Sequence, residues 1–206
     1  MNRFGSDLQK VVNEIAACRI CRDGQVGRPL PHEPRPVLQP SSTGRILIAS
    51  QAPGTRVHAS GRPFTDPSGE RLRTWLGIGP EIFYDPKVIA IVPMGFCFPG
   101  LSDKDSDLPP RSECAKAWRA RVLAAMPQIE LVIAVGSYAL RWHMGGRYQA
   151  SLHKTVVAWR DGLALSPIVL ALPHPSWRNN AWLKRNPWFE TDLLPVLRRE
   201  VAARLG

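Results

Sequence analysis

The sequence has 206 residues and a net charge of +10, with a pI of about 10.1. This length suffices for one domain with a full hydrophobic core. The positive charge favours an anionic partner, and nucleic acid is the first candidate, although a basic protein without a polyanionic partner is the alternative. No stretch approaches the roughly 18 apolar residues of a membrane span, and we recognise no signal peptide. We therefore expect a cytoplasmic protein that makes no contact with a membrane.

Helical patterns and short apolar runs alternate along the chain. Residues 6–17 predict a helix with Ser6 as its cap. Residues 23–44 contain five prolines and predict an extended connecting segment. Buried strands are expected in four apolar runs, at about 45–49, 88–92, 131–135 and 168–172. Further helices are expected after Pro67, from Ser112 to about 125, after Gly136 to about 144, weakly at 151–159, and at about 188–203. Ser112 is the expected cap of the helix that reaches about residue 125.

This alternation is typical of a parallel sheet covered by helices on both faces. We therefore predict an α/β fold, a three-layer α/β/α sandwich with a central four-stranded, mostly parallel sheet. We predict one domain over residues 1–206, with the Pro-rich segment 23–44 inside it.

The stretch that follows the first strand is the first candidate for chemistry. It breaks at Pro53-Gly54, turns again before Phe64, and reaches Asp66 at the start of a helix. Asp66 is a good helix cap with Pro67 behind it and Gly77 beyond the helix end, so capping is the structural alternative to a chemical role. Ligands of open α/β sheets bind at the carboxyl ends of the strands, which is where this loop begins.

Four cysteines form the second candidate site. Cys18 and Cys21 have the spacing of a metal or redox hairpin, whereas Cys97 and Cys114 are too far apart for a zinc knuckle. Cys97 lies in residues 94–111, which predict a long structureless loop, and loops of that length usually have a function. Buried free thiols, a zinc site and an iron–sulfur cluster all remain open from the spacing alone.

Several motifs together resemble one family. They are Ser50-Gln51-Ala52-Pro53-Gly54 after the first strand, Gly61-Arg62-Pro63-Phe64 before the next helix, and His174-Pro175-Ser176 after the last strand. With the cysteine layout, they resemble the uracil-DNA glycosylase superfamily, and most closely its branch with a [4Fe-4S] cluster. Within that branch the chain resembles neither of two groups fully, one with an acidic first motif and one of broad specificity. Gln51 stands where the first group has its acidic residue, and Pro93 stands where several families have an asparagine.

The resemblance implies a role for each matched position. A [4Fe-4S] cluster would be held by Cys18, Cys21, Cys97 and Cys114. The base would be bound by Gln51, Ala52, Phe64 and Pro93. Asp66 and His174 would be catalytic. DNA would be contacted by Ser176, Trp177, Arg178, Asn179, Lys184 and Arg185, unless Trp177 instead packs against Trp182 or Trp188.

The expected activity is hydrolysis of the N-glycosidic bond of uracil, or of another deaminated base, in DNA by a monofunctional glycosylase that initiates base excision repair. The expected partner is DNA that contains such a base, and we expect a monomer. One alternative is a protein of the same fold that binds uracil-containing or abasic DNA without efficient turnover. Another is a metal-stabilised nucleic-acid-binding protein unrelated to repair.

Overall fold

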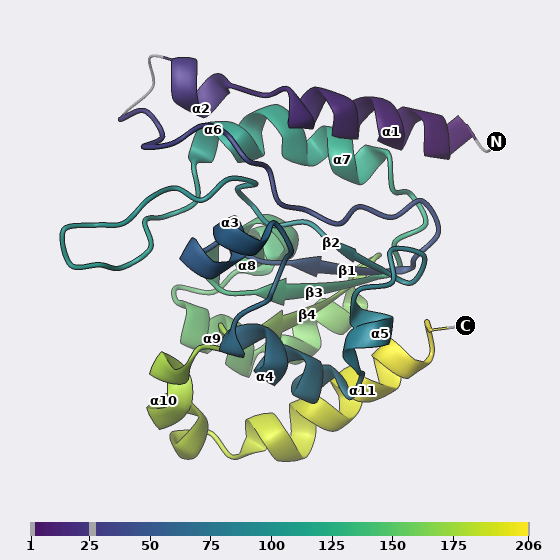
Figure 1. The fold of residues 1–206 in the computed structure, drawn as a ribbon. Coiled ribbons are helices and arrows are strands. Elements are labelled where there is room, and N and C mark those ends of the chain that lie inside the picture. The colour runs from purple at the N-terminus through teal and green to yellow at the C-terminus, as the bar shows by residue number, and fades with distance from the viewer. Residues whose placement is uncertain (1–2, 25–27, 206) are drawn as a thin grey trace.

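Four short apolar segments form the central sheet of the computed structural model, which describes residues 3–24 and 28–205 (Figure 1). The strands are β1 (Ile46–Ala49), β2 (Ile89–Ile91), β3 (Leu131–Val135) and β4 (Ile168–Leu172), in the order β2-β1-β3-β4. All three pairings are parallel, and almost every strand residue is buried. Parallel strands of this kind require cover on both faces of the sheet.

Helices supply that cover and form the two outer layers. Figure 1 shows α1 (Arg3–Ala16) and α7 (Ala120–Ala124) on one side of the sheet, and α4 (Pro67–Leu76) with α11 (Leu194–Ala202) on the other. The predicted three-layer α/β/α fold is therefore confirmed, with a sheet that is parallel throughout. The other α-helices are α2 (Ile20–Asp23), α3 (Thr55–Ser60), α5 (Pro80–Phe83), α6 (Ser112–Cys114), α8 (Ser137–Met144), α9 (Leu152–Val157) and α10 (Asn180–Arg185).

Two predicted helices are more irregular than their sequence patterns suggested. Between α6 and α7 lies a π-helical turn, η1 (Ala115–Arg119), and another, η5 (Phe189–Leu193), precedes α11. The expected cap of the first of these helices was wrong, because Arg111 occupies the N-cap position and Ser112 is the first helical residue. The remaining short helices are of the 3₁₀ type, η2 (Gly145–Arg147), η3 (Trp159–Ala164) and η4 (Trp177–Asn179).

Residues 94–111 are not structureless, contrary to the prediction. Leu101 and Asp107 form an antiparallel bridge, and the Ser102 amide donates to the Ser106 carbonyl at 2.8 Å. The Leu108 amide donates to the Gly100 carbonyl at 3.0 Å and extends the same antiparallel pairing. The middle of the loop is therefore a small hairpin, which projects from the end of the molecule toward which the strands point (Figure 1).

The described part of the Pro-rich segment is extended, as predicted, and residues 25–27 lie outside the description. Gln39 forms an antiparallel bridge with Ile91 and donates its side-chain amide to the Ile89 carbonyl at 2.9 Å. The segment thereby covers the free edge of β2, which would otherwise present unpaired backbone groups. Over residues 3–24 and 28–205, no helix combines the length and the apolar character needed to cross a bilayer.

Gly69 in α4 is a packing constraint that a substitution can test. A Cβ at this position would collide with the carbonyl of Phe64, whereas a Cβ on Gly5 in α1 would meet nothing within 4 Å. We expect Gly69→Ala to destabilise the fold by about 2 kcal/mol and lower the melting temperature by roughly 4–8 °C. Gly5→Ala should leave the melting temperature equal or higher, since alanine favours a helix by up to about 1 kcal/mol. Equal melting curves for the two variants would contradict this packing.

Candidate functional site

A cleft of about 820 Å³ opens at the carboxyl ends of the strands. Its walls come from the loops that follow β1, β2 and β4 and from the segment before α4. Ten of the twelve residues predicted to bind the base, act in catalysis or contact DNA line it: Gln51, Ala52, Phe64, Asp66, Pro93, His174, Ser176, Trp177, Arg178 and Asn179. The remaining two, Lys184 and Arg185, are exposed on α10, directly after this wall of the cleft.

Phe64 has a strained backbone that its neighbours hold in place. Its φ is 54°, a left-handed conformation that a bulky residue rarely adopts. The Tyr84 hydroxyl donates to the Phe64 carbonyl at 2.9 Å, and an Arg73 N–H donates to the same oxygen at 3.4 Å. The Arg62 guanidinium covers the Tyr84 ring at 3.5 Å. Such strain persists only where surrounding contacts fix it, and it concentrates at functional sites.

His174 is mostly buried in the cleft wall. Burial lowers the pKa of its imidazole, nearby Arg178 acts in the same direction, and Asp66 acts against them. The ring is therefore neutral at pH 7 and can donate one hydrogen bond. Asn179 fixes the backbone at this point, because its side-chain amide donates to the His174 carbonyl at 2.6 Å.

Asp66 occupies the N-cap position of α4, as predicted, but its carboxylate makes no capping hydrogen bond within the described chain. The alternative in which Asp66 serves only as a cap is therefore wrong. Its side chain lines the cleft together with Phe64, from the same loop, and His174, from the loop after β4. The carboxylate is available for a role in the cleft.

The loop after β4 is attached to α4. Arg71 donates to the Ser176 carbonyl at 3.1 Å and to the Asn180 side chain at 2.8 Å. Trp177 is 72% exposed, so the alternative in which it packs against other tryptophans is wrong. Trp182 packs instead against Trp188, with 5.8 Å between the ring centroids. An exposed tryptophan at the rim of a cleft is unusual for a side chain of this size.

The first motif is joined to the loop after β2 by its backbone. The carbonyls of Ser50 and Gln51 accept hydrogen bonds from the amides of Met94 and Gly95 at 2.8 and 2.9 Å. The Gln51 side chain lies over Gly136, where a Cβ would come within 2.8 Å of its Nε2 atom. Gly136 also has a φ of 82°, so glycine is required there both for the backbone conformation and for space.

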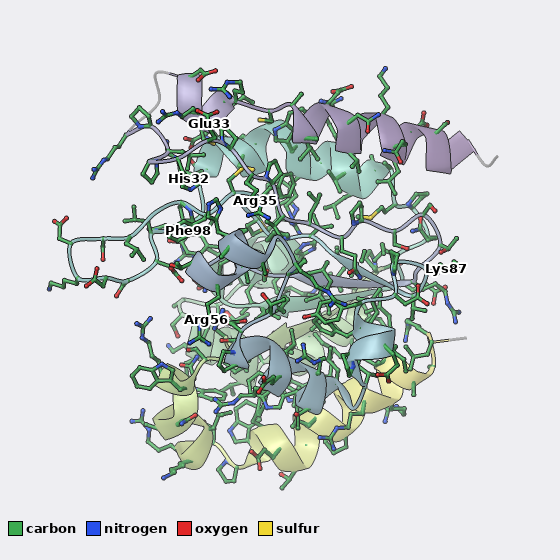
Figure 2. All side chains as sticks on the ribbon, viewed as in Figure 1. His32, Glu33, Arg35, Arg56, Lys87 and Phe98 are labelled. Atoms are coloured by element: carbon green, nitrogen blue, oxygen red, sulfur yellow. The ribbon has the colours of Figure 1, made fainter. Side chains whose placement is uncertain are left out.

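Sequence reasoning missed three charged residues of the cleft, of which one is Arg71 on α4, described above. The other two are Arg56 and Asp107. Arg56 is exposed on α3, on the side of the molecule toward which the strands point (Figure 2). Asp107, from the hairpin in residues 94–111, also lines the cleft, and its carboxylate lies next to Gly54 of the first motif. Arg56 and Asp107 belong to no recognisable motif. The helix α3, which carries Arg56, begins directly after Pro53-Gly54, a pair that predicted only a turn.

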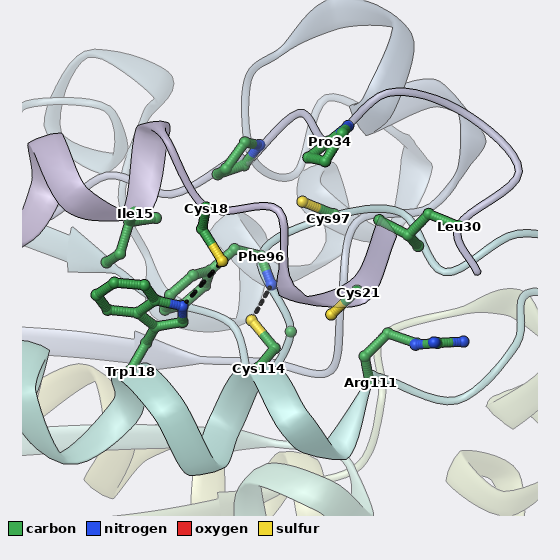
Figure 3. Close-up of a pocket in the computed structure, with 12 residues that line it drawn as sticks. Ile15, Cys18, Cys21, Leu30, Pro34, Phe96, Cys97, Arg111, Cys114 and Trp118 are labelled. Carbon is green, nitrogen blue, oxygen red and sulfur yellow. Dashed lines mark hydrogen bonds between the residues drawn. The ribbon is translucent and has the colours of Figure 1, made fainter. Parts of the chain in front are cut away.

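All four cysteines line a second, smaller cavity of about 20 Å³ on the other side of the loop after β2. Figure 3 shows their sulfur atoms directed toward a shared space between α1, α2 and the start of α6. The Trp118 indole N–H donates to Cys18 Sγ at 3.2 Å, and the Phe96 amide donates to Cys114 Sγ at 3.4 Å. None of the four forms a disulfide.

The protonation of these thiols follows from their surroundings. Burial raises the pKa of Cys97 to about 11 and that of Cys114 to about 12. Burial and the negative charge of Glu113 raise the pKa of Cys21. Among the described residues, no three His, Cys, Asp or Glu side chains are grouped so as to hold a metal ion. The iron–sulfur cluster thus stays a prediction.

Comparison with known families agrees with the motifs and the cleft. A sequence model described as "Uracil DNA glycosylase superfamily" matches residues 37–198. This range contains all four strands, all residues that line the cleft, and every predicted site residue apart from Cys18 and Cys21. The chain belongs to the uracil-DNA glycosylase superfamily.

Proposed function

We propose that this protein is a monofunctional DNA glycosylase that hydrolyses the N-glycosidic bond of uracil in DNA and so initiates base excision repair. Other deaminated bases are further candidate substrates. One observation carries the proposal. An aromatic ring, a carboxylate and a neutral imidazole, from Phe64, Asp66 and His174, line one cleft in a member of this superfamily.

The cleft suits a nucleotide that has left the double helix. A base inside a duplex is out of reach of an enzyme, so enzymes that act on it rotate the nucleotide into a pocket. The volume of about 820 Å³ is within the range of small-molecule sites. Trp177 stands exposed at the rim, where it can enter the base stack and compensate for the lost stacking.

Phe64 and His174 would act on the base itself. Stacking of a base on an aromatic ring contributes about 1–3 kcal/mol. The hydrogen bonds from Tyr84 and Arg73 to the Phe64 carbonyl hold the backbone from which this ring projects. Cleavage of the N-glycosidic bond leaves negative charge on the departing base. A neutral, buried imidazole that donates a hydrogen bond to this charge stabilises the transition state without a change in its own protonation.

Asp66 would act on the sugar side. The anomeric carbon gains positive charge as the bond breaks, and a carboxylate nearby stabilises that charge. The carboxylate can also orient the attacking water. Because the Asp66 side chain does not cap α4, neither role competes with a structural one.

The first test is base excision by the wild-type protein and by His174→Ala. A uracil-containing oligonucleotide, incubated with excess enzyme and then treated with alkali, should be cut at the uracil position. His174→Ala should lower the single-turnover rate about 10²–10³-fold, as the loss of one preorganised donor does in other enzymes.

The pH profile of the same reaction tests the protonation state of His174. The neutral ring is the donor, and burial lowers its pKa below the ordinary 6.5. Any decline of the wild-type rate that follows protonation of His174 should therefore be centred below pH 6.5. A decline centred at or above 6.5 that disappears in His174→Ala would contradict the neutral donor, provided that circular dichroism shows the variant folded.

A second candidate function is binding without turnover. Gln51 and Pro93 favour it. The Gln51 amide cannot accept a proton as a carboxylate would, and the Pro93 side chain cannot form hydrogen bonds with a base edge as an asparagine would. In the oligonucleotide experiment, a retarded band without alkali-sensitive cleavage would support this function and refute the glycosylase.

DNA binding should depend steeply on salt. Arg178, Lys184 and Arg185 are exposed beside the cleft and are our candidates for phosphate contacts. Replacing all three by Ala should make the slope of log K against log salt shallower by roughly 2–3, since each phosphate contact contributes about 0.9. Lys87→Ala is the matched control, because Lys87 lies at the opposite edge of the molecule from Arg56 (Figure 2). An equal slope for the triple variant and the control would exclude these residues from the interface.

We further propose that the cysteine cavity holds a [4Fe-4S] cluster. Four cysteines line it without a histidine among them, and two of the sulfurs accept N–H bonds that would stabilise thiolates. A cluster is larger than one metal ion, so its ligands can stand farther apart than those of a single ion. When bound, the cluster would cross-link the chain between α1 and the loop after β2.

Protein purified without oxygen should be brown, contain iron and acid-labile sulfide in equal amounts, and show visible absorbance that a reductant bleaches. Cys97→Ser should lose both iron and colour. Colourless wild-type protein that contains zinc would show that the cysteines serve a different metal.

A further inference from the structure

Asp107 is a carboxylate of the cleft that no motif includes. It stands at the base of the hairpin within residues 94–111, where it pairs with Leu101 across the antiparallel bridge. The next residue, Leu108, donates its amide to the Gly100 carbonyl and so continues the pairing of the two arms of the hairpin. The backbone of Asp107 is therefore fixed, although residues 102–107 are all polar.

The side chain of Asp107 lies against the first motif. Its Oδ2 atom lies 3.0 Å from the point where a Cβ would stand on Gly54. A Cβ there would be a tight contact, and the carboxylate would have to shift by a few tenths of an ångström. The carboxylate group therefore stands against the same loop as Gln51, whose amide has no basic lone pair at neutral pH.

Charged groups on two other elements face Asp107. Partial removal from water raises the pKa of its carboxyl, and the negative charge of Asp66 adds to this effect. Arg178 in η4 opposes it. The residue as a whole is exposed at the mouth of the cleft. Its carboxylate thus has access to water and binds a proton more readily than an ordinary aspartate.

The carboxylates that line the cleft within the described chain are Asp66 and Asp107. Asp66 shares its wall with His174, and its charge acts on that imidazole. We propose that Asp107 is a catalytic residue that accepts a proton from the attacking water, while Asp66 stabilises the positive charge of the sugar. This inference rests on the proposed glycosylase activity and names the general base of that reaction.

The step is a simple hydrolysis. The water oxygen bonds to the anomeric carbon, and one water proton passes to the Asp107 carboxylate. The bond between the anomeric carbon and the base nitrogen breaks, and its electron pair leaves with the base. The base then takes up a proton from solvent, and Asp107 returns its own proton to solvent. Two carboxylates in different surroundings can divide the work in this way.

The test compares Asp107→Asn with Asp103→Asn under single-turnover conditions on a uracil-containing oligonucleotide. Both changes remove one negative charge from the same hairpin, but Asp103 is exposed at its tip and does not line the cleft. Asp107→Asn should lower the rate about 10²-fold or more, within the range of general bases. Asp103→Asn should keep the wild-type rate within about twofold.

The acid side of the pH profile separates a chemical role from a structural one. If Asp107 is the base, its protonation and that of His174 both lower the wild-type rate at low pH. Asp107→Asn then loses only the Asp107 contribution, so its residual rate falls less steeply with decreasing pH than the wild-type rate does. A wild-type rate and profile in Asp107→Asn would overturn the inference while leaving the glycosylase intact. Absence of excision by the wild-type protein on uracil, hypoxanthine and xanthine would instead refute the proposed function itself.

Discussion

The parallel pairing of β1, β2, β3 and β4 is the constraint on which the cleft depends. Ile48 is paired with Ile91 on one side and with Ile133 on the other, so neighbouring strands end level with one another. The loops after β1, β2 and β4 consequently leave the sheet at one edge. Residues as far apart in sequence as Gln51 and His174 line the same cleft for this reason alone. The burial of both sheet faces stabilises the arrangement, since each strand is surrounded by apolar side chains.

The loop after β2 joins the two sites of the molecule. It begins at Pro93 in the cleft wall, passes Cys97 in the cysteine cavity, returns to the cleft at Asp107, and leaves through Arg111 beside the cysteines. A group bound by the cysteines would therefore fix the loop on one side and the position of Asp107 on the other. This connection explains how a cofactor remote from the base could affect excision without taking part in it.

The sequence was sufficient for the strands, because short apolar runs buried on both faces are a local pattern. It was also sufficient for most of the cleft, because its residues fall in short motifs at the ends of those strands. The strained Phe64 backbone and the hairpin that carries Asp107 could not be predicted. The first depends on Tyr84, twenty residues away, and the second on backbone hydrogen bonds among polar residues without alternation. The π-helical turns likewise break a periodicity that looked regular.

The central claim is that a base removed from the DNA stack binds in this cleft, between the Phe64 ring and His174. A crystal structure with DNA that contains a uracil nucleotide fluorinated on the sugar, and therefore resistant to hydrolysis, would test it most directly. The account predicts the uracil ring stacked on Phe64, an oxygen of the base next to His174, and the anomeric carbon open to water beside Asp107. A uracil that remains paired within the duplex, or that binds outside the cleft, would contradict it.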